Sequence, residues 1–318
     1  MLPIDELVDF SRTLDDDGHS PVPDAVAEVW SLGRPRFVRS SASHVFVAQR
    51  RDGEGRVVVR LRPDEDSHRD ELERAARAAA SWSAADAPVV NAVAAPSGHF
   101  TERVEGYVAH VLDAAEGDTL AERDDLVEHA ADWGEALARL HLTGHGVIGV
   151  PDTGDRLVAE SRAAEDETAT LAVLLERRLA ALPRGPEVHG VLHGDPEADN
   201  AVLTDQGVVM IDLDRVTRGW FAADVAFALR DWSTVADGVD LDHDVPRQFV
   251  AGYRRVRDLS EEELGWLPLL TQASAVTELL AFQVHLATVP QPAWPDWAVD
   301  LDHRVRARAA ALRDELTA

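Results

Sequence analysis

The chain has 318 residues, 45% of them hydrophobic, so it is long enough for two lobes and is neither disordered nor of low complexity. The lack of cysteine excludes disulfides, thiolate zinc sites and cysteine nucleophiles. With 31 basic and 58 acidic residues, the net charge of −27 disfavours nucleic acids and anionic membranes as partners; it would suit a cationic substrate, or simply reflect an acidic proteome.

The N-terminal residues, MLPIDELVDFSRTLDDDG, carry acids early and lack a basic segment followed by an apolar run, which argues against a secretory signal. No apolar run approaches the length of a membrane-spanning helix. We therefore expect a cytoplasmic protein, monomeric or homodimeric. The chain contains no lysine, so any phosphate-binding role that lysine usually fills must fall to arginine.

The N-terminal third predicts a small antiparallel sheet with one helix against it. Residues 1–30 are predicted to be helical, with a break at residues 20–23. Residues 67–85 are predicted to form a helix, because Leu72, Ala75, Ala76, Ala79 and Trp82 follow helical spacing. β-rich runs separated by turn residues predict strands at residues 36–40, 44–50, 56–61, 88–96 and 106–117.

After residue 117 the sequence is mainly helical. Long helical patterns cover residues 119–145 and 157–183, and helices are expected from about residue 221 to the end. Between them, residues 191–214 predict a strand pair with its turn at residues 204–207. We therefore predict an α+β fold of two lobes, residues 1–113 with the sheet and residues 114–318 with most of the helices.

Residues 191–214 read VLHGDPEADNAVLTDQGVVMIDLD and place several polar side chains at strand ends. Asp195 and Asn200 have the Asp-x-x-x-x-Asn spacing of a kinase catalytic loop. In such a loop Asp195 would face an acceptor hydroxyl while Asn200 turns towards a metal ion. Asp212, at the end of the following strand, would reach the same metal, and Mg²⁺ prefers such oxygen ligands.

HGDPEADN, IDLD and GWFAADVA, together with EALARLH at residues 135–141, resemble the aminoglycoside phosphotransferase and kinase-like phosphotransferase superfamily. That superfamily includes choline kinases, homoserine kinase-like enzymes, macrolide phosphotransferases and a bacterial stress-response protein kinase family. The resemblance covers most of the chain. It implies a bilobal protein-kinase-like fold, an N-terminal nucleotide-binding lobe, and Mg²⁺-dependent transfer of the γ-phosphate of ATP or GTP to a hydroxyl of a small molecule.

The resemblance also implies roles for individual residues. Asp195 becomes the catalytic base or hydroxyl-orienting carboxylate, and Asn200 and Asp212 become the Mg²⁺ ligands. We expect turnover to be abolished by Asp195→Ala, with nucleotide binding retained. The supporting residues are His193, which would fix the loop by hydrogen bonds, Asp214, which is a second metal contact or a structural acceptor, and Asp224, which ties the loop to the next helix or is an ordinary acid at a helix start.

On the nucleotide side, Arg60 in the third strand takes the place of the cation that reaches the phosphates. Arg62 competes for this role, because the two-residue period of a strand puts both on one face. We expect Arg60 to pair with Glu71 of the following helix rather than with Glu73. In the serine-rich loop RSSASHVF, Ser43 falls where relatives carry asparagine, and it is expected to contact phosphate.

This loop lacks the glycine of many relatives, so the chain could be a catalytically weak binding module; a protein Ser/Thr kinase is the other alternative. Glu197 also departs from relatives, which often have histidine there; it faces a cationic acceptor or is a solvated loop acid. The acceptor is expected to be a small molecule, for example an antibiotic such as an aminoglycoside or a macrolide, although the sequence leaves an amino alcohol or a sugar equally open. Acids that could bind a polycation are Asp231, Asp237, Asp240, Asp242, Asp244 and Glu278, although a charged surface is the more ordinary role for most of them. The tryptophans of this half would contact an apolar acceptor or fill the core.

Overall fold

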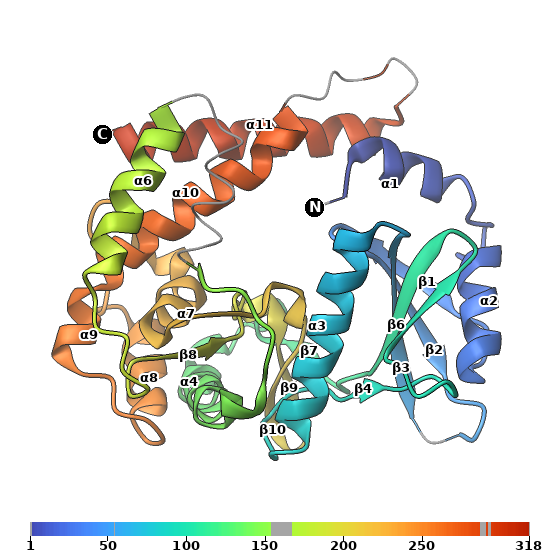
Figure 1. The fold of residues 1–318 in the computed structure, drawn as a ribbon, viewed down its shortest axis with the longest axis horizontal. Helices are drawn as coiled ribbons and strands as arrows, with labels where there is room; N and C mark the ends of the chain where they lie inside the picture. Colours follow the sequence, from blue (N-terminus) through green and yellow to red (C-terminus); the bar gives the residue numbers. More distant parts are fainter. Residues whose placement is uncertain (1, 54, 154–166, 287–290, 292–293, 318) are drawn as a thin grey trace.

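The computed structural model describes residues 2–53, 55–153, 167–286, 291 and 294–317, and it has two lobes (Figure 1). In the described residues, the N-terminal lobe holds a six-stranded antiparallel sheet in the order β1-β2-β3-β6-β4, with β5 also paired to β6. The strands are β1 Arg36–Ser40, β2 His44–Gln49, β3 Arg56–Pro63, β4 Ala92–Val93, β5 Thr101–Val104 and β6 Tyr107–Asp113. The helices of this lobe are α1 Ile4–Ser11, α2 Pro21–Trp30 and α3 Asp66–Ser83.

Strand β3 shows why the sheet positions a site. Val57, Val59 and Leu61 are fully buried in an apolar cluster with side chains of β2, β6 and α2. Because successive side chains of a strand point to opposite faces, Arg60 and Arg62 lie on the other face. Both are buried there. The sheet therefore carries its core on one face and two cations on the other.

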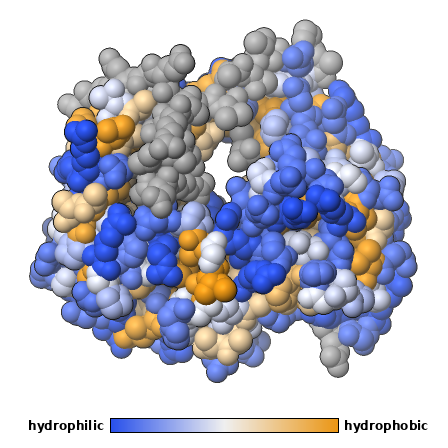
Figure 2. All heavy atoms as spheres, viewed as in Figure 1, coloured by the Kyte–Doolittle hydropathy of each residue, from blue (hydrophilic) through white to orange (hydrophobic). Residues whose placement is uncertain are grey.

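Helix α3 packs between the lobes. The predicted stripe of Leu72 and the alanines is buried, and the indole N–H of Trp82 donates to the Leu140 carbonyl in α4 of the C-terminal lobe at 3.0 Å. The core around Trp82 is continuous with the main core of the C-terminal lobe. Figure 2 shows a gap between the lobes, bordered on the side of the N-terminal lobe mainly by hydrophilic residues.

The C-terminal lobe is mainly helical. Its helices are α4 Leu126–Thr143, α6 Glu167–Ala180, α7 Phe221–Ala228, α8 Asp244–Tyr253, α9 Glu261–Gly265, α10 Leu267–Leu286 and α11 Asp296–Thr317. Its strands are β7 Asp118–Thr119, β8 His189–Leu192, β9 Ala201–Thr204, β10 Gly207–Met210, β11 Thr217–Trp220, β12 Ser233–Thr234 and β13 Gly238–Val239. The hairpin of β9 and β10 and the pair of β8 and β11 frame the HGDPEADN segment.

The predicted α+β architecture of a sheet lobe and a helical lobe is confirmed, and the element predictions need four corrections. The strand predicted at residues 88–96 is only the two residues of β4, β5 was not predicted, and the region after residue 221 includes the β12–β13 hairpin. The break predicted at residues 20–23 is the start of α2, because Ser20 precedes the helix and Pro21 occupies its first position, which needs no N–H. Residues 157–166 of the helix predicted at 157–183 lie outside the described residues. None of the helices in the described ranges is long and apolar enough to cross a membrane.

Candidate active site

The HGD segment forms a tight loop directly after β8. Gly194 has φ +84°, and a Cβ there would lie 2.0 Å from the carbonyl oxygen of Arg215. Any other residue would be strained and would clash with backbone, so glycine is required. The close approach packs the loop against the 3-10 turn η4 Leu213–Arg215.

Asp224 of α7 anchors this loop. Its carboxylate accepts from the backbone N–H groups of His193 at 2.7 Å and Gly194 at 3.0 Å. It also lies 3.0 Å from Nε2 of His141 in α4, whose Nδ1 is 2.6 Å from the Tyr253 hydroxyl of α8. Asp224 is 2% exposed, so three elements converge on a carboxylate that is shielded from water. The sequence did not identify His141 as part of this network.

His193 is fully buried and bonded within the loop. Its Nε2 lies 2.9 Å from the carbonyl oxygen of Ile211, and its Nδ1 accepts from the Asp195 backbone N–H at 3.3 Å. Both contacts are satisfied by a neutral ring with the proton on Nε2. His193 therefore joins the loop to the end of the β9–β10 hairpin.

Asp195 holds a buried carboxylate oxygen, Oδ1, that has no hydrogen-bond partner among the described residues. Burial raises the pKa of Asp195; the charge of Arg215 opposes this, and the charge of Asp212 adds to it. A buried acceptor without a partner is uncommon in native structures and indicates a functional group or a missing partner. Asp195 therefore has the free oxygen and the basicity that a proton acceptor needs.

Asn200 and Asp212 lie at the open end of the hairpin. The Ile211 N–H donates to the Asn200 carbonyl at 2.9 Å, so the two segments are adjacent. The Asn200 amide nitrogen donates to the Asp195 carbonyl at 2.9 Å. Asp212 has φ +62°, a left-handed conformation that costs a non-glycine residue about 1–2 kcal/mol. This turn directs the chain so that Asp212 and Asp214 both meet the arginines of β3.

Arg60 bridges the lobes by pairing with both aspartates. It donates to Asp212 at 2.8 and 3.3 Å and to Asp214 at 2.7 Å. Burial disfavours the charged guanidinium, but the two carboxylates outweigh it and raise the pKa of Arg60. Burial also works to raise the pKa of Asp212, yet Arg60 outweighs it and lowers that pKa to about 2. Asp214, which is more deeply buried, has a raised pKa.

The predicted pairing of Arg60 with Glu71 is wrong. Glu71 instead accepts from Arg62 at 2.6 Å, and Arg62 also donates to Ser43 at 2.9 Å and to Asp214 at 2.6 Å. Both arginines share a strand face, but Arg60 lies closer to the aspartates of the other lobe and uses its donors there. Arg62 therefore makes the contact to helix α3 that was assigned to its neighbour.

Two further residues near the arginines were missed. Arg39 of β1 has a guanidinium nitrogen 3.7 Å from Asp212 and a half-exposed side chain. His110 of β6 pairs in register with Arg60, is fully buried and has a pKa well below the usual value, because burial and then the two arginines disfavour its charge. Because the chain has no lysine, an arginine at the start of the serine-rich segment RSSASHVF, here called the phosphate loop, was the available signal for Arg39. Glu73 lies outside this cluster and bonds to Arg77 and Thr101.

Glu197 is neither a solvated loop acid nor directed at an acceptor. Its side chain is 22% exposed and forms an ion pair with Arg230, which follows α7. Burial raises the pKa of Glu197 to about 7; Arg230 opposes the shift, and the nearby charge of Asp195 adds to it.

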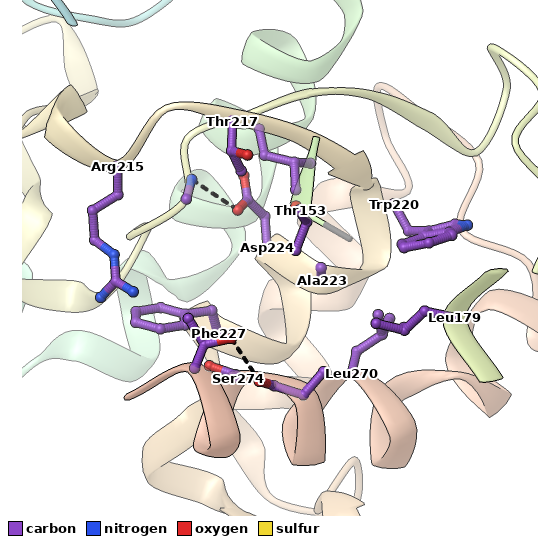
Figure 3. Close-up of a pocket in the computed structure, with 14 residues that line it drawn as sticks. Thr153, Leu179, Arg215, Thr217, Trp220, Ala223, Asp224, Phe227, Leu270 and Ser274 are labelled. Carbon is purple, nitrogen blue, oxygen red and sulfur yellow. Dashed lines mark hydrogen bonds between the residues drawn. The ribbon is translucent and has the colours of Figure 1, made fainter. Parts of the chain in front are cut away.

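A pocket of about 700 Å³, including the part open to solvent, lies in the C-terminal lobe beside the catalytic loop (Figure 3). Its lining residues are Thr153, Leu179, Leu192, Gly194, Arg215, Thr217, Trp220, Ala223, Asp224, Phe227, Leu270, Ala273, Ser274 and Thr277. None of the six acids considered for a polycation, at residues 231–244 and 278, is in this lining. Trp220 lines the pocket, whereas Trp266 and Trp294 are packed into the protein.

The described residues contain no group of three or more His, Asp or Glu side chains that could hold a metal ion by themselves. The oxygen donors of Asn200 and Asp212 nevertheless suit Mg²⁺, which usually takes one or two protein ligands together with phosphate oxygens and waters. The unpartnered oxygen of Asp195 lies in the same loop. The residues present therefore fit a phosphate-bound Mg²⁺ ion.

Comparison with known proteins extends this description. Residues 36–259 match the family model described as "Phosphotransferase enzyme family". The chain is 30% identical over 202 residues to a homoserine kinase of Caulobacter sp. (strain K31), and this match covers 59% of the chain and 62% of that protein. It is 34% identical over 200 residues to a homoserine kinase of Bradyrhizobium sp. (strain BTAi1 / ATCC BAA-1182), covering 59% of the chain and 60% of that protein. The chain thus spans less than two thirds of the length of the curated relatives it matches.

Among solved structures, the fold matches an amicoumacin kinase in complex with AMP-PNP and Ca²⁺, with a TM-score of 0.67, 14% identity, and coverage of 96% of this chain and 92% of the other. It also matches a choline/ethanolamine kinase family protein from Mesorhizobium loti, with a TM-score of 0.58, 17% identity and 88% coverage of both chains. These structures confirm the predicted bilobal kinase-like fold, and the family model confirms the resemblance stated from the sequence motifs.

Proposed function

The chain belongs to the phosphotransferase enzyme family, and from this premise we propose that it transfers the γ-phosphoryl group of ATP to a hydroxyl of a small molecule. The observation that carries the proposal is the buried, unpartnered carboxylate oxygen of Asp195, the residue that follows the pocket-lining Gly194. In the proposed arrangement the N-terminal lobe, residues 1–113, binds the nucleotide. The C-terminal lobe, residues 114–318, supplies the catalytic loop and the acceptor pocket.

Asp195 acts as the proton acceptor. It takes the proton of the acceptor hydroxyl as that oxygen bonds to the γ-phosphorus and the bond from phosphorus to the leaving ADP oxygen breaks. Its raised pKa strengthens it as a base. His193 and Asp224 hold the loop by the hydrogen bonds described above, so the carboxylate stays in place without an additional ordering cost.

The nucleotide side uses arginine. Arg60 and Arg62 supply two buried positive charges on the cleft face of the sheet, and Ser43 is bonded to Arg62 at the base of the phosphate loop. Asp214 and Glu71 hold the guanidinium groups in place. Ser43 and Glu71 thus contribute to nucleotide binding through Arg62, and the exposed Arg39 is an additional candidate for a phosphate contact.

Asn200 and Asp212 are the residues that would hold Mg²⁺. When bound, the ion neutralises charge on the β- and γ-phosphates. Asp212 suits this role because its lowered pKa keeps it ionised over the whole neutral range. Its bonds to Arg60 hold that carboxylate in place at the end of the hairpin.

The acceptor is a hydroxylated small molecule. The sequence relatives are named homoserine kinases, which supports an amino alcohol or hydroxy amino acid, whereas the amicoumacin kinase likeness in fold is compatible with an antibiotic. An amino-acid acceptor fits the available observations at least as well as an antibiotic. An assay of ADP formation with each kind of acceptor distinguishes an amino acid from an antibiotic.

The test is acceptor-dependent ADP formation by purified protein with Mg²⁺ and either ATP or GTP. We expect Asp195→Asn, which keeps the side-chain shape, to reduce kcat by about 10²- to 10⁴-fold, the usual contribution of a general base. Nucleotide affinity measured by calorimetry should change less than about threefold. Full activity in the variant would refute the assigned base. Nucleotide binding without turnover across a broad acceptor panel would favour a binding module instead.

A further inference from the structure

The lining of the C-terminal pocket includes a guanidinium group, that of Arg215, although the chain as a whole is acidic. Two guanidinium groups approach the ring of Phe227, Arg230 at 4.9 Å and Arg215 at 5.6 Å from its centroid. Arg230 is already paired with Glu197. Arg215 has no ion pair and no hydrogen bond to any described residue, although its side chain is half-buried in the pocket wall. Figure 3 shows it at one end of the pocket, away from Trp220 and Leu179.

The carboxylate in the described lining is not available to a cationic ligand. Asp224 accepts from two backbone N–H groups and contacts His141, so its oxygens are committed to the loop. The remaining lining is apolar or carries hydroxyl groups. An ammonium group entering this pocket would lose its hydration and meet Arg215, which is unfavourable, whereas an anion would meet an unpaired cation.

We propose that Arg215 recognises a carboxylate of the acceptor, so that the phosphorylated molecule is a hydroxy acid or hydroxy amino acid rather than a polycation. This inference rests on the proposed function and narrows its substrate class. The acceptor carboxylate pairs with the guanidinium, its hydroxyl lies at Asp195, and any apolar remainder packs towards Leu270 and Trp220. A planar guanidinium can hold a carboxylate by two parallel N–H···O bonds, which also orients the hydroxyl.

The position of Arg215 favours the acceptor over the nucleotide as the source of this anion. Arg215 packs on Phe227 of α7 and lines a pocket built from α6, α7 and α10. It makes no ion pair with Asp212 or Asp214, which are held by Arg60 and Arg62 of the other lobe. Its proximity to Asp195 would place a carboxylate and a hydroxyl of one small molecule side by side.

The experiment compares acceptors that differ only in charge. Purified protein with ATP and Mg²⁺ is assayed for ADP release with matched pairs of hydroxy acid and carboxamide, including L-homoserine with L-homoserinamide and 4-hydroxybutyrate with 4-hydroxybutyramide, and with kanamycin A as the polycation. The variants are Arg215→Gln and, as a matched control near the same ring, Arg230→Gln. ATP affinity by calorimetry checks that each variant is folded.

We expect the unsubstituted protein to favour carboxylates over carboxamides by about 10- to 100-fold in kcat/KM, the range expected for a charge-assisted bidentate pair. Arg215→Gln should abolish that preference, mainly through KM; because the charge of Arg215 also acts on Asp195, the carboxamide rates measured in the same variant are the reference for this loss. Arg230→Gln should keep the preference, because its charge is already paired with Glu197.

Three results would overturn the inference. Equal use of acids and amides, or preference for kanamycin A, would exclude carboxylate recognition and leave the proposed phosphotransfer intact. A uniform fall in kcat for all acceptors in Arg215→Gln, with the acid preference retained, would assign Arg215 to the transferred phosphoryl group. ADP release that does not depend on any acceptor would contradict the proposed function, and this inference with it.

Discussion

Two carboxylates of the catalytic loop, Asp195 and Glu197, have raised pKa values for the same physical reason. Each is withdrawn from water, and each lies near another carboxylate: Asp212 raises the pKa of Asp195, and Asp195 raises that of Glu197. Their neighbours differ: Glu197 has an ion-pair partner in Arg230, whereas Asp195 keeps an oxygen without a partner in the described residues. The loop therefore contains one carboxylate with an oxygen that has no partner in the described residues, Asp195, and one that titrates close to neutral pH, Glu197.

Glu197→Gln should change the pH dependence of stability. The folded-state pKa of Glu197, about 7, lies above its ordinary value of 4.5, so the folded protein holds this proton more tightly than the unfolded chain. The contribution of Glu197 to the free energy of unfolding is therefore fully present below about pH 4.5 and is lost as the pH rises through 7. Glutamine stays neutral, so the Tm of the variant relative to the unsubstituted protein should rise between pH 5 and pH 8. A Tm difference that does not vary with pH would contradict the raised pKa.

The two ion pairs of Arg62 differ in how deeply their acidic partners are buried. The Asp214 side chain is 6% exposed and meets Arg62, whose side chain is 7% exposed, whereas Glu71 on the outer side of Arg62 is 44% exposed. Removing Arg62 leaves the buried Asp214 with Arg60 alone and costs about 1–3 kcal/mol or more, because the acceptor is charged, while an exposed pair contributes about 0–1 kcal/mol. Arg62→Met should therefore destabilise the protein by about 1–3 kcal/mol or more, and Glu71→Gln by less than about 1 kcal/mol. Urea unfolding measures both, and similar losses in the two variants would contradict this account.

At the scale of residues, the sequence predicted which side chains form the candidate site better than it predicted the side chains with which they pair. The spacing of Asp195 and Asn200 and the position of Asp212 are local properties of a loop and a hairpin, so they can be read from the chain. Which of Arg60 and Arg62 pairs with Glu71 could not be read from the chain. The strand period gives both arginines the same face, and only the placement of α3 and η4 distinguishes their partners. Arg215 was missed because its neighbours in the pocket come from distant helices.

At the scale of elements, the close contact of α4 and α8 depends on two glycines. A Cβ on Gly134 would lie 2.0 Å from the carbonyl oxygen of Phe249, and one on Gly252 would lie 1.8 Å from that of Ala131. Both contacts are with backbone, which cannot move aside as a side chain can. Helix α4 also carries His141 of the loop-anchoring network, so its position matters to the site.

Gly134→Ala should force the two helices apart and destabilise the protein by about 1–3 kcal/mol or more, the range for overpacking. Gly265→Ala is the matched control: nothing lies within 4 Å of its Cβ position, at the end of α9. That variant should be neutral or more stable by about 0.4–1 kcal/mol, because alanine restricts the unfolded chain. Thermal unfolding separates the two, and a tolerated Gly134→Ala would show that the helices can adjust.

Periodicity explains which elements were predicted. The long amphipathic helix α3 and the alternating strands β2 and β3 have strong local patterns, and they were found within a few residues of their ends. Short strands such as β4 and β5 are held by pairing with β6 rather than by local pattern, so their sequence carries little signal. The same holds for the β12–β13 hairpin within an otherwise helical region.

At the scale of the whole molecule, the lobes are joined in two places besides the interface formed by α3 and the arginines of β3. The chain passes between them after β6, and helix α1 of the N-terminal lobe also lies against α11 of the C-terminal lobe (Figure 1). Ile4 and Val8 of α1 form a small apolar cluster with Trp294 and Ala298. The sequence predicted helix in this segment, but a predicted helix does not specify its partner nearly 300 residues away.

Helix α1 is also joined to the phosphate loop. The Leu2 N–H donates to the Ser41 carbonyl at 2.8 Å, and Glu6 accepts from the Tyr107 hydroxyl at 3.0 Å and contacts His44 at 3.1 Å. The His44 ring in turn stacks on Phe10, with 3.7 Å between ring centroids. Helix α11, α1 and the loop that precedes β2 therefore form a continuous chain of contacts on the side of the cleft opposite the connection after β6.

Weakening this second connection should loosen the phosphate loop without touching it. Trp294 is 8% exposed and donates its indole N–H to Asp5 at 2.7 Å. Trp294→Phe keeps an aromatic ring but removes that bond, and the loss of one such hydrogen bond to a charged group corresponds to about 1.5–3 kcal/mol. Because α1 is bonded to Ser41 and His44, we expect faster amide hydrogen exchange at residues 40–46 and a KM for ATP raised several-fold. Trp297→Phe, at a tryptophan that is 43% exposed, is the control and should change neither quantity. Unaltered exchange in Trp294→Phe would show that the phosphate loop is held by the sheet alone and that α1 does not couple it to the C-terminal lobe.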